Sequence, residues 1–272
     1  NFMKRLRHFC EELKPGFALI GEVLFGDYNL IVNDEMLHSC TNYECYKGIY
    51  SSFNSMNMFE IAHSLNRQYG PEQWCIYRGK HLMTFVDNHD VSRLATILTN
   101  KNHIPLAYGL LFGMPGIPCI YYGSEWGEEG AKAPDNDYAL RPCFEEPKPN
   151  KLTAFIKALI ALRRESDALC NGTYHNVVIT NHQLVFERRT ESERVLVAIN
   201  ASDAEYTAGS HELNGTFSRM LTYPGEFKAL VSKVALEEAE NFSDQEAAAA
   251  DTVTLNGQIT MPAYSVQYLK MC

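Results

Sequence analysis

In the first part of the chain, short apolar runs alternate with segments whose apolar residues recur at helical spacing. Over residues 2–13 the apolar positions fall every three or four residues, which predicts a helix that ends at Pro15-Gly16. A helix is also predicted over 56–68, a buried helix over the apolar run 104–113, and a helix with one apolar stripe over about 152–164. Apolar runs predict strands over 17–23, 37–43, 82–90 and 117–125. This alternation indicates parallel βα units.

After Gly172 the pattern changes to strands joined by turns. The predicted strands fall within 176–190, 194–202, 215–223, 251–261 and 263–271. None of the intervening segments has a helical pattern long enough to cross over, so we expect an antiparallel all-β domain. The acidic, alanine-rich stretch 233–250 predicts a surface helix or a loose insertion. These patterns divide the chain into an α/β domain over 1–168 and an all-β domain over 169–272.

The composition of the chain argues against two classes of binding partner. The chain has 272 residues, of which 46% are hydrophobic and 21% charged, and its formal net charge is -9. That charge argues against a nucleic-acid groove, so no nucleic-acid partner is predicted. No stretch is long and apolar enough to span a bilayer, so no membrane partner is predicted either.

The eight cysteines are scattered and include no C-x-x-C pair, which is typical of reduced thiols and slightly favours a cytoplasmic location. The chain opens on a helix-like run rather than on a leader, so we expect it to be a piece of a longer protein.

Polar side chains stand where the predicted parallel strands end. They are Glu22 after the first strand, Asn42 and Tyr43 after the second, Asp87 to Asp90 in the third, and Tyr121, Tyr122 and Glu125 in the fourth. In a parallel βα architecture, functional side chains gather at the carboxyl ends of the strands. We therefore expect these groups to meet at one face of the sheet.

Two carboxylates from different strands suit acid catalysis on a glycosidic bond. Glu22 follows a hydrophobic strand, and partial burial there would favour its protonated, proton-donating form. Asp90 stands beside His89 and would stay ionised, where it could stabilise positive charge on a sugar ring. Tyrosine rings stack on the C–H faces of sugars, and an imidazole can bind hydroxyl groups.

Other interpretations fit the same residues. A glutamate at a strand end is also typical of a salt-bridge partner or a helix-start residue. A His-Asp pair can be a local hydrogen bond, or it can bind a metal in a barrel hydrolase. No H-x-H or H-E-x-x-H motif accompanies His89 and Asp90, so the spacing gives little support to a metal site. The residues by themselves indicate a segment of a βα barrel in which acid chemistry is one of several options.

Several motifs resemble those of the α-amylase family, glycoside hydrolase family 13. Residues 85–90, FVDNHD, with Ser92-Arg93 after them, are similar to that family's strand-seven motif. Gly21-Glu22-Val23 resembles its strand-five motif, and residues 116–125, GIPCIYYGSE, resemble its strand-eight motif. Arg141-Pro142 and the segment 162–174 resemble the stretches that follow in the family. The resemblance covers nearly the whole chain, and its subgroup is most similar to the neopullulanase and cyclomaltodextrinase branch.

The resemblance implies a fold and a role for each residue. The fold would be α/β, the second half of a (β/α)8 TIM barrel followed by an antiparallel β-sandwich. The resemblance makes Glu22 the general acid/base and Asp90 the third catalytic carboxylate. The remaining implied site residues bind the sugar: His89, Asn88, Arg93, Tyr43 and Tyr122. Arg93 has the alternative of orienting its own loop.

The resemblance also implies that the intact protein cleaves starch-derived α-glucan oligosaccharides with retention. The implied partner is an α-glucan oligosaccharide, and no cofactor or metal is implied in this part of the barrel.

One part of the family pattern is missing. The family's G-x-R-x-D motif, which carries the catalytic nucleophile, does not occur in this sequence. We therefore expect the chain to be inactive alone, with either an N-terminal half-barrel or a second copy completing the fold. The alternative function is a non-catalytic sugar-binding or assembly module on an amylase-like scaffold.

Overall fold

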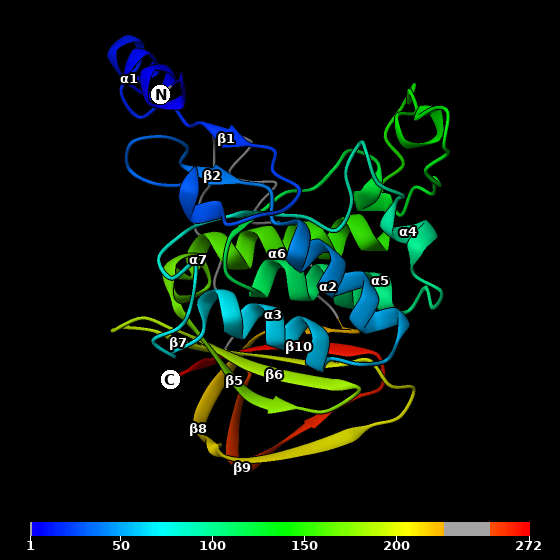
Figure 1. Cartoon of the computed structure of the whole chain (residues 1–272). Coiled ribbons are helices and arrows are strands. Elements are labelled where there is room, and N and C mark those ends of the chain that lie inside the picture. The colour runs from blue at the N-terminus through cyan, green and yellow to red at the C-terminus, as the bar shows by residue number, and fades with distance from the viewer. Residues whose placement is uncertain (1, 226–250) are drawn as a thin grey trace, which may run out of the picture.

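Helices and an antiparallel sheet form two layers of the molecule (Figure 1). A computed structural model describes residues 2–225 and 251–272, so the predicted acidic segment 233–250 lies outside the described residues. Helix α1 (Phe2–Leu13) projects away from the rest and buries none of its residues. Two short strands, β1 (Ile20–Gly21) and β2 (Ser39–Cys40), lie between α1 and the helical layer, and the large sheet packs beneath the helices.

The four predicted parallel strands are present but short. They are β1 (Ile20–Gly21), β2 (Ser39–Cys40), β3 (Met83–Thr84) and β4 (Ile117–Pro118). β1 pairs with β2 and β3 with β4, in both cases parallel, and a parallel bridge between Thr41 and Met83 links the two pairs. The strands therefore follow one another across the sheet in chain order, and the residues after each strand emerge on one side of it.

The helical layer contains helices that the sequence pattern predicts and others that it misses. The helices after α1 are α2 (Tyr43–Asn54), α3 (Phe59–Tyr69), α4 (Leu94–Ile97), α5 (His103–Gly113), α6 (Lys151–Glu165) and α7 (Asp167–Asn171). Helices α1, α3, α5 and α6 lie at their predicted places, whereas α2, α4 and α7 are not predicted. The Asn42 side chain begins α2 by accepting a hydrogen bond from the Cys45 amide at 3.1 Å. Gly48 and the aromatic residues within α2 have low helix propensity, which hides the helix in the sequence.

The second part of the chain is antiparallel, as predicted. Its strands are β5 (Thr173–Ile179), β6 (Gln183–Arg189), β7 (Arg194–Asn200), β8 (Tyr206–Tyr223), β9 (Thr252–Met261) and β10 (Ser265–Met271). In the described residues they form one six-stranded sheet of order β5-β6-β7-β10-β8-β9, not two separate sheets. The sheet curls, and its far face encloses a second apolar cluster that includes Phe217, Ile259 and Leu269.

Helix α5 joins the two layers. Its glycines let it approach the sheet closely, since a Cβ at Gly109 would lie 2.9 Å from both methyl groups of Val266 in β10. Two buried arginines bind the carbonyl groups at its end. Arg163 donates to Phe112 O at 2.6 Å, and Arg188 donates to Gly113 O at 2.8 Å. These contacts fix the end of α5 to α6 and to β6.

Replacing Gly109 by Ala is expected to lower the free energy of unfolding by about 1–3 kcal/mol, because the added methyl group overlaps Val266. Chemical denaturation measures this change. Gly209→Ala is the matched control, because the nearest atom to a Cβ there is Gly257 O at 3.8 Å. An equal effect of the two substitutions would contradict the close packing of α5 on β10.

Candidate active site

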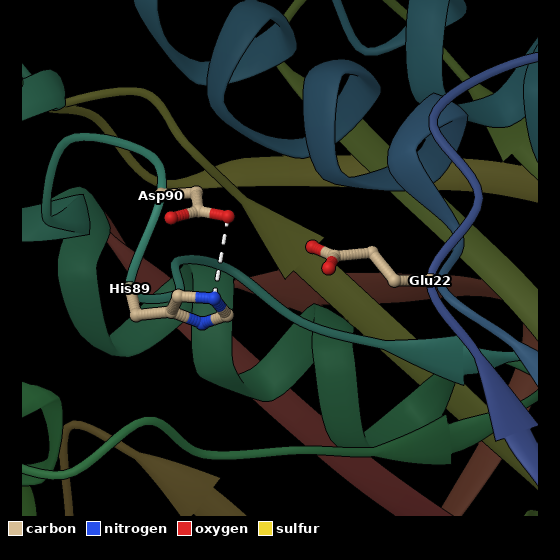
Figure 2. Close-up of side chains that lie close together, drawn as sticks. All are labelled: Glu22, His89 and Asp90. Carbon is tan, nitrogen blue, oxygen red and sulfur yellow. Dashed lines mark ion pairs between the residues drawn. The ribbon is translucent and has the colours of Figure 1, made fainter.

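The ends of β1 and β3 bring the two predicted catalytic carboxylates together. Glu22 follows β1 directly, and Asp90 lies in the turn after β3. Figure 2 shows the Glu22 carboxylate pointing toward Asp90 and His89. One oxygen from each carboxylate and one ring nitrogen of His89 all lie within 4.8 Å of one another. These side chains therefore face a common space.

A hydrogen-bond chain connects the Glu22 carboxylate with the backbone of Asp90. The Tyr43 hydroxyl donates to Glu22 Oε1 at 3.1 Å and accepts from Asn88 Nδ2 at 3.0 Å. The Asn88 Oδ1 atom in turn accepts from the Asp90 amide at 2.8 Å. Burial raises the pKa of Tyr43, as do its hydrogen bond and proximity to Glu22, so its hydroxyl keeps its proton at neutral pH. Tyr43 and Asn88 thus fix the relative position of the two acids.

Basic side chains surround Asp90. Arg141 Nη2 binds Asp90 Oδ1 at 2.9 Å, and its Nε donates to the His89 carbonyl at 3.3 Å. His89 Nε2 lies 3.2 Å from Asp90 Oδ2. Lys132 Nζ donates to the Asp90 carbonyl at 2.7 Å. These contacts hold the Asp90 carboxylate in place, where it can stabilise positive charge on a neighbouring group.

Asp87 stabilises the structure of the segment that carries His89 and Asp90. It is 2% exposed, and its carboxylate accepts hydrogen bonds from the Leu94 amide at 2.8 Å and from Ser124 Oγ at 2.7 Å. Burial raises the pKa of Asp87, and the charge of Arg93 opposes that rise. The bond to Leu94 pairs the first backbone amide of α4, which gives the acidic residue after the buried strand a structural role.

Arg93 orients the loop rather than meeting the solvent. It is 0% exposed, and its guanidinium donates to Tyr122 O at 2.6 Å, to Ser124 Oγ at 3.0 Å and to Leu140 O at 2.8 Å. It also stacks over the Tyr121 ring at 4.2 Å. The expectation that Arg93 touches a sugar is therefore wrong for this structure, because no part of its side chain is accessible. The alternative, an orienting arginine, agrees with these contacts.

The surroundings of Glu22 and of Tyr122 in the structure differ from those that the sequence predicts. Glu22 is exposed, not partly buried, because only the Tyr43 hydroxyl contacts its carboxylate among the described residues. Tyr122 is 43% exposed, but its hydroxyl donates to the Pro142 carbonyl at 2.8 Å. Tyr122 therefore offers its ring, not its hydroxyl, to a ligand.

Arg141 and Lys132 are additions to the predicted set. Arg141 lies in the Arg141-Pro142 pair, so the sequence contained a signal for it, but that signal does not say which group it binds. Nothing in the sequence pattern marks Lys132. Both reach the Asp90 turn from the long loop after β4, which brings together residues more than forty positions apart.

Comparison with known proteins now identifies the family. A family model described as "Alpha amylase, catalytic domain" matches residues 1–146, more than half of the chain. The chain belongs to the α-amylase family. This membership confirms the family predicted from the motifs around Glu22, Asp90 and residues 116–125.

Relatives and solved structures agree with this assignment. The chain is 26% identical over 231 residues to a cyclomaltodextrinase of Thermoanaerobacter pseudethanolicus, covering 79% of this chain and 37% of that protein. It is 28% identical over 208 residues to an intracellular maltogenic amylase of Bacillus subtilis, covering 72% and 34%. An α-amylase structure from Geobacillus thermoleovorans, complexed with acarbose, superposes with a TM-score of 0.77 at 18% identity, covering 100% of this chain and 57% of that one.

This α-amylase family chain therefore has an amylase-like fold. It spans little more than a third of the length of the curated relatives it matches. None of the helices in the described part of the chain combines the length and hydrophobicity that crossing a bilayer requires.

Proposed function

We propose that this chain supplies the acid/base and the third carboxylate of a retaining α-glucan hydrolase that acts on starch-derived oligosaccharides. The observation that carries the proposal is the convergence of Glu22, His89 and Asp90 at the ends of two parallel strands. Glu22 protonates the glycosidic oxygen, and Asp90 stabilises the positive charge that develops on the sugar ring.

The other site residues assist in defined ways. His89 binds sugar hydroxyls in the subsite where the bond breaks, because its half-exposed ring lies beside Asp90. Tyr43 and Asn88 link Glu22 to the turn that carries Asp90 and so hold the two acids in their relative positions. The Tyr122 ring is accessible for stacking. Arg93 is a positioning residue, since it binds the backbone of the loops around the site.

The proposal assigns the nucleophile to a segment that this sequence does not contain. Double displacement needs a nucleophile about 5 Å from the acid, on the other side of the anomeric carbon. We infer that the four parallel strands β1 to β4 are the second half of a (β/α)8 barrel. The matching half comes from a preceding segment of the same protein or from a second chain. Such a half would also cover Glu22 and supply the burial that its role as a proton donor requires.

We assign residues 1–168 to this half-barrel and residues 169–272 to a C-terminal β domain of the sandwich type, in which the curled sheet folds over its second apolar cluster. The names of the relatives support a cyclomaltodextrinase or maltogenic branch. The intracellular maltogenic amylase among them supports a cytoplasmic site of action.

Turnover of maltooligosaccharides tests the proposal. The 272-residue chain alone is expected to be inactive, whereas the longer product of its gene is expected to hydrolyse maltoheptaose and to release products with the α configuration. Proton magnetic resonance of the first products reports that configuration. A longer product that carries G-x-R-x-D, folds and yet leaves maltoheptaose intact would disprove the hydrolase and leave a sugar-binding module as the better account.

A metal-dependent hydrolase is the second candidate, because Glu22, His89 and Asp90 have ligand atoms within 4.8 Å of one another. Two atoms bound to one zinc at about 2.1 Å stand closer together, at about 3.4 Å. Arg141 already places a fixed positive charge on Asp90, which opposes a second cation there. Activity that survives exhaustive chelation favours the glycosidase, and activity that chelation removes and zinc restores favours the metal site.

A further inference from the structure

A cavity of about 480 Å³ lies at the opposite ends of β3 and β4 from the candidate active site. On one side it is lined by the loop between α3 and β3 and by Pro115-Gly116, just before β4. The start of β5 and one residue of β6 line the other side. We call it the basic cavity, and it is defined by Arg78, Lys80, His81, His175 and Arg188. None of the roles in catalysis or sugar binding proposed above uses these residues.

The lining of the basic cavity is positively charged, although the chain as a whole is acidic. The sequence has 33 Asp and Glu residues against 24 Lys and Arg residues. None of the described residues that line the basic cavity is an aspartate or a glutamate, whereas Arg78, Lys80 and Arg188 each carry a positive charge. A cavity lined by charges of one sign favours a ligand of the opposite sign, so an anion is the expected occupant.

The charged side chains of the loop contact carbonyl oxygens, which leave their charge uncompensated. Arg78 Nη2 donates to the carbonyls of Gly70 and Glu72, at 3.0 Å and 2.6 Å. Lys80 Nζ donates to Val32 O at 2.7 Å. Neither side chain takes part in an ion pair within residues 2–225 and 251–272. Both charges are therefore available to a ligand.

Two buried guanidinium groups add positive charge behind the wall. Arg188 is 1% exposed and Arg163 is 7% exposed, and the hydrogen bonds of both go to carbonyl oxygens. Burial and the charge of Arg163 lower the pKa of Arg188 to about 9. Burial and the charges of the two arginines also lower the pKa of His81. Because these positive groups oppose one another, a negative charge in the basic cavity would reduce their repulsion.

A ligand in the basic cavity can reach three of the side chains that define it. Arg78 and His81 are exposed and Lys80 is half-buried, whereas Arg188 is inaccessible and acts through its charge alone. Within the described residues, Arg78 bonds through Nη2 only, which leaves its Nε and Nη1 groups for a ligand. His175 is a weaker candidate, because its Nε2 lies 2.9 Å from a carboxylate oxygen of Glu212.

The donor set selects the kind of anion. A guanidinium and an ammonium group that line one cavity suit an oxyanion with several acceptor oxygens and more than one negative charge. We propose that the basic cavity binds a dianionic phosphoryl group, with Arg78, Lys80 and His81 as the contacting residues. The bound group would stabilise the packing of the loop between α3 and β3 on the large sheet, because residues 172–175 form the opposite wall. This proposal does not depend on the proposed hydrolase.

Titration calorimetry of the 272-residue chain with inorganic phosphate tests the site. At constant ionic strength, set with potassium chloride, we expect saturable binding with a dissociation constant of about 0.1–1 mM. Phosphate at about 10 mM is also expected to raise the melting temperature by about 2–5 °C, because it binds the folded state. A titration without saturable heat would overturn the proposal.

Variants then locate the bound phosphate. Arg78→Ala and Lys80→Ala are each expected to weaken phosphate binding by about five- to tenfold. Lys151→Ala, at an exposed position that begins α6, is the matched control and is expected to bind as the unmodified chain does. Circular dichroism confirms that each variant is folded. Phosphate binding that both Arg78→Ala and Lys80→Ala leave intact would overturn the proposal, even if these variants melt at a lower temperature without phosphate.

Two further ligands identify the source of the phosphoryl group. Tighter binding of α-glucose 1-phosphate than of inorganic phosphate supports the site and assigns it to a phosphorylated sugar. Equal or weaker binding of that ester supports the site and assigns it to free phosphate. Glucose is neutral and is expected not to bind, so saturable glucose binding as strong as that of phosphate would overturn the proposal. Each outcome is independent of whether the longer gene product hydrolyses maltoheptaose.

Discussion

Replacing Glu22 by Gln is expected to lower the rate of maltoheptaose hydrolysis by the longer gene product about 10³-fold. The amide cannot deliver a proton to the glycosidic oxygen, and general acid catalysis contributes about 10²–10⁴-fold. The substitution removes one charge at an exposed side chain whose contact is the Tyr43 hydroxyl, so little change in folding is expected. Steady-state rates on maltoheptaose measure the effect.

A substrate whose leaving group needs no proton distinguishes a catalytic acid from a residue with a structural role. α-Maltosyl fluoride needs no proton to release fluoride, so the Glu22→Gln variant is expected to regain most of its bond-cleaving rate on that substrate. Asp90→Asn is expected to stay slow on both substrates, because its charge acts on the sugar ring whatever leaves. Glu72→Gln, at an exposed position in the loop after α3, is the matched control. Equal losses on the two substrates for Glu22→Gln would refute its role as the acid.

Replacing Arg93 by Ala is expected to lower the free energy of unfolding by about 3–5 kcal/mol. The change leaves Asp87 buried without its nearby cation and removes the donors that bind Tyr122 O, Ser124 Oγ and Leu140 O. Urea denaturation followed by circular dichroism measures it. Lysine keeps the charge but has no planar fork to reach several carbonyls, so Arg93→Lys is expected to restore only part of the loss.

A double-mutant cycle tests the buried network of Asp87, Arg93 and Ser124 specifically. Asp87→Asn combined with Arg93→Ala is expected to show a coupling of about 1–3 kcal/mol, since the two side chains belong to one buried network with Ser124. Arg5→Ala, at an exposed position on α1, is expected to change stability by less than about 0.5 kcal/mol. An Arg93→Ala variant as stable as the Arg5→Ala variant would show that the buried guanidinium does not hold the loops together.

The sequence predicted those features that depend on local pattern. Apolar spacing located α1 and α6, and a continuous apolar run located α5, which is apolar on all sides. The polar groups at the strand ends located Glu22 and Asp90, because parallel strands present their carboxyl ends on one side. The family motifs gave the assignment that the comparison confirms.

The features that the sequence missed depend on contacts between distant segments. Helix α2 begins at Tyr43, which is the last residue of a predicted strand, so the apolar pattern hides the start of the helix. Arg93 was expected to meet a sugar, because no local pattern distinguishes a guanidinium that binds distant carbonyls from one that faces solvent. The carbonyls that bury it belong to Tyr122 and Leu140, which are 29 and 47 residues away. The exposure of Glu22 likewise depends on which other segments cover it.

The central claim is that Glu22 and Asp90 act on the same sugar ring. A crystal structure of the Glu22→Gln variant of the longer gene product with maltoheptaose bound tests it most directly. The account predicts that the side chain at position 22 lies within hydrogen-bonding distance of a glycosidic oxygen. In the same complex, the Asp90 carboxylate binds hydroxyls of the ring that carries that bond. Maltoheptaose bound with Asp90 and position 22 on different sugar rings, or with neither in contact, would contradict it.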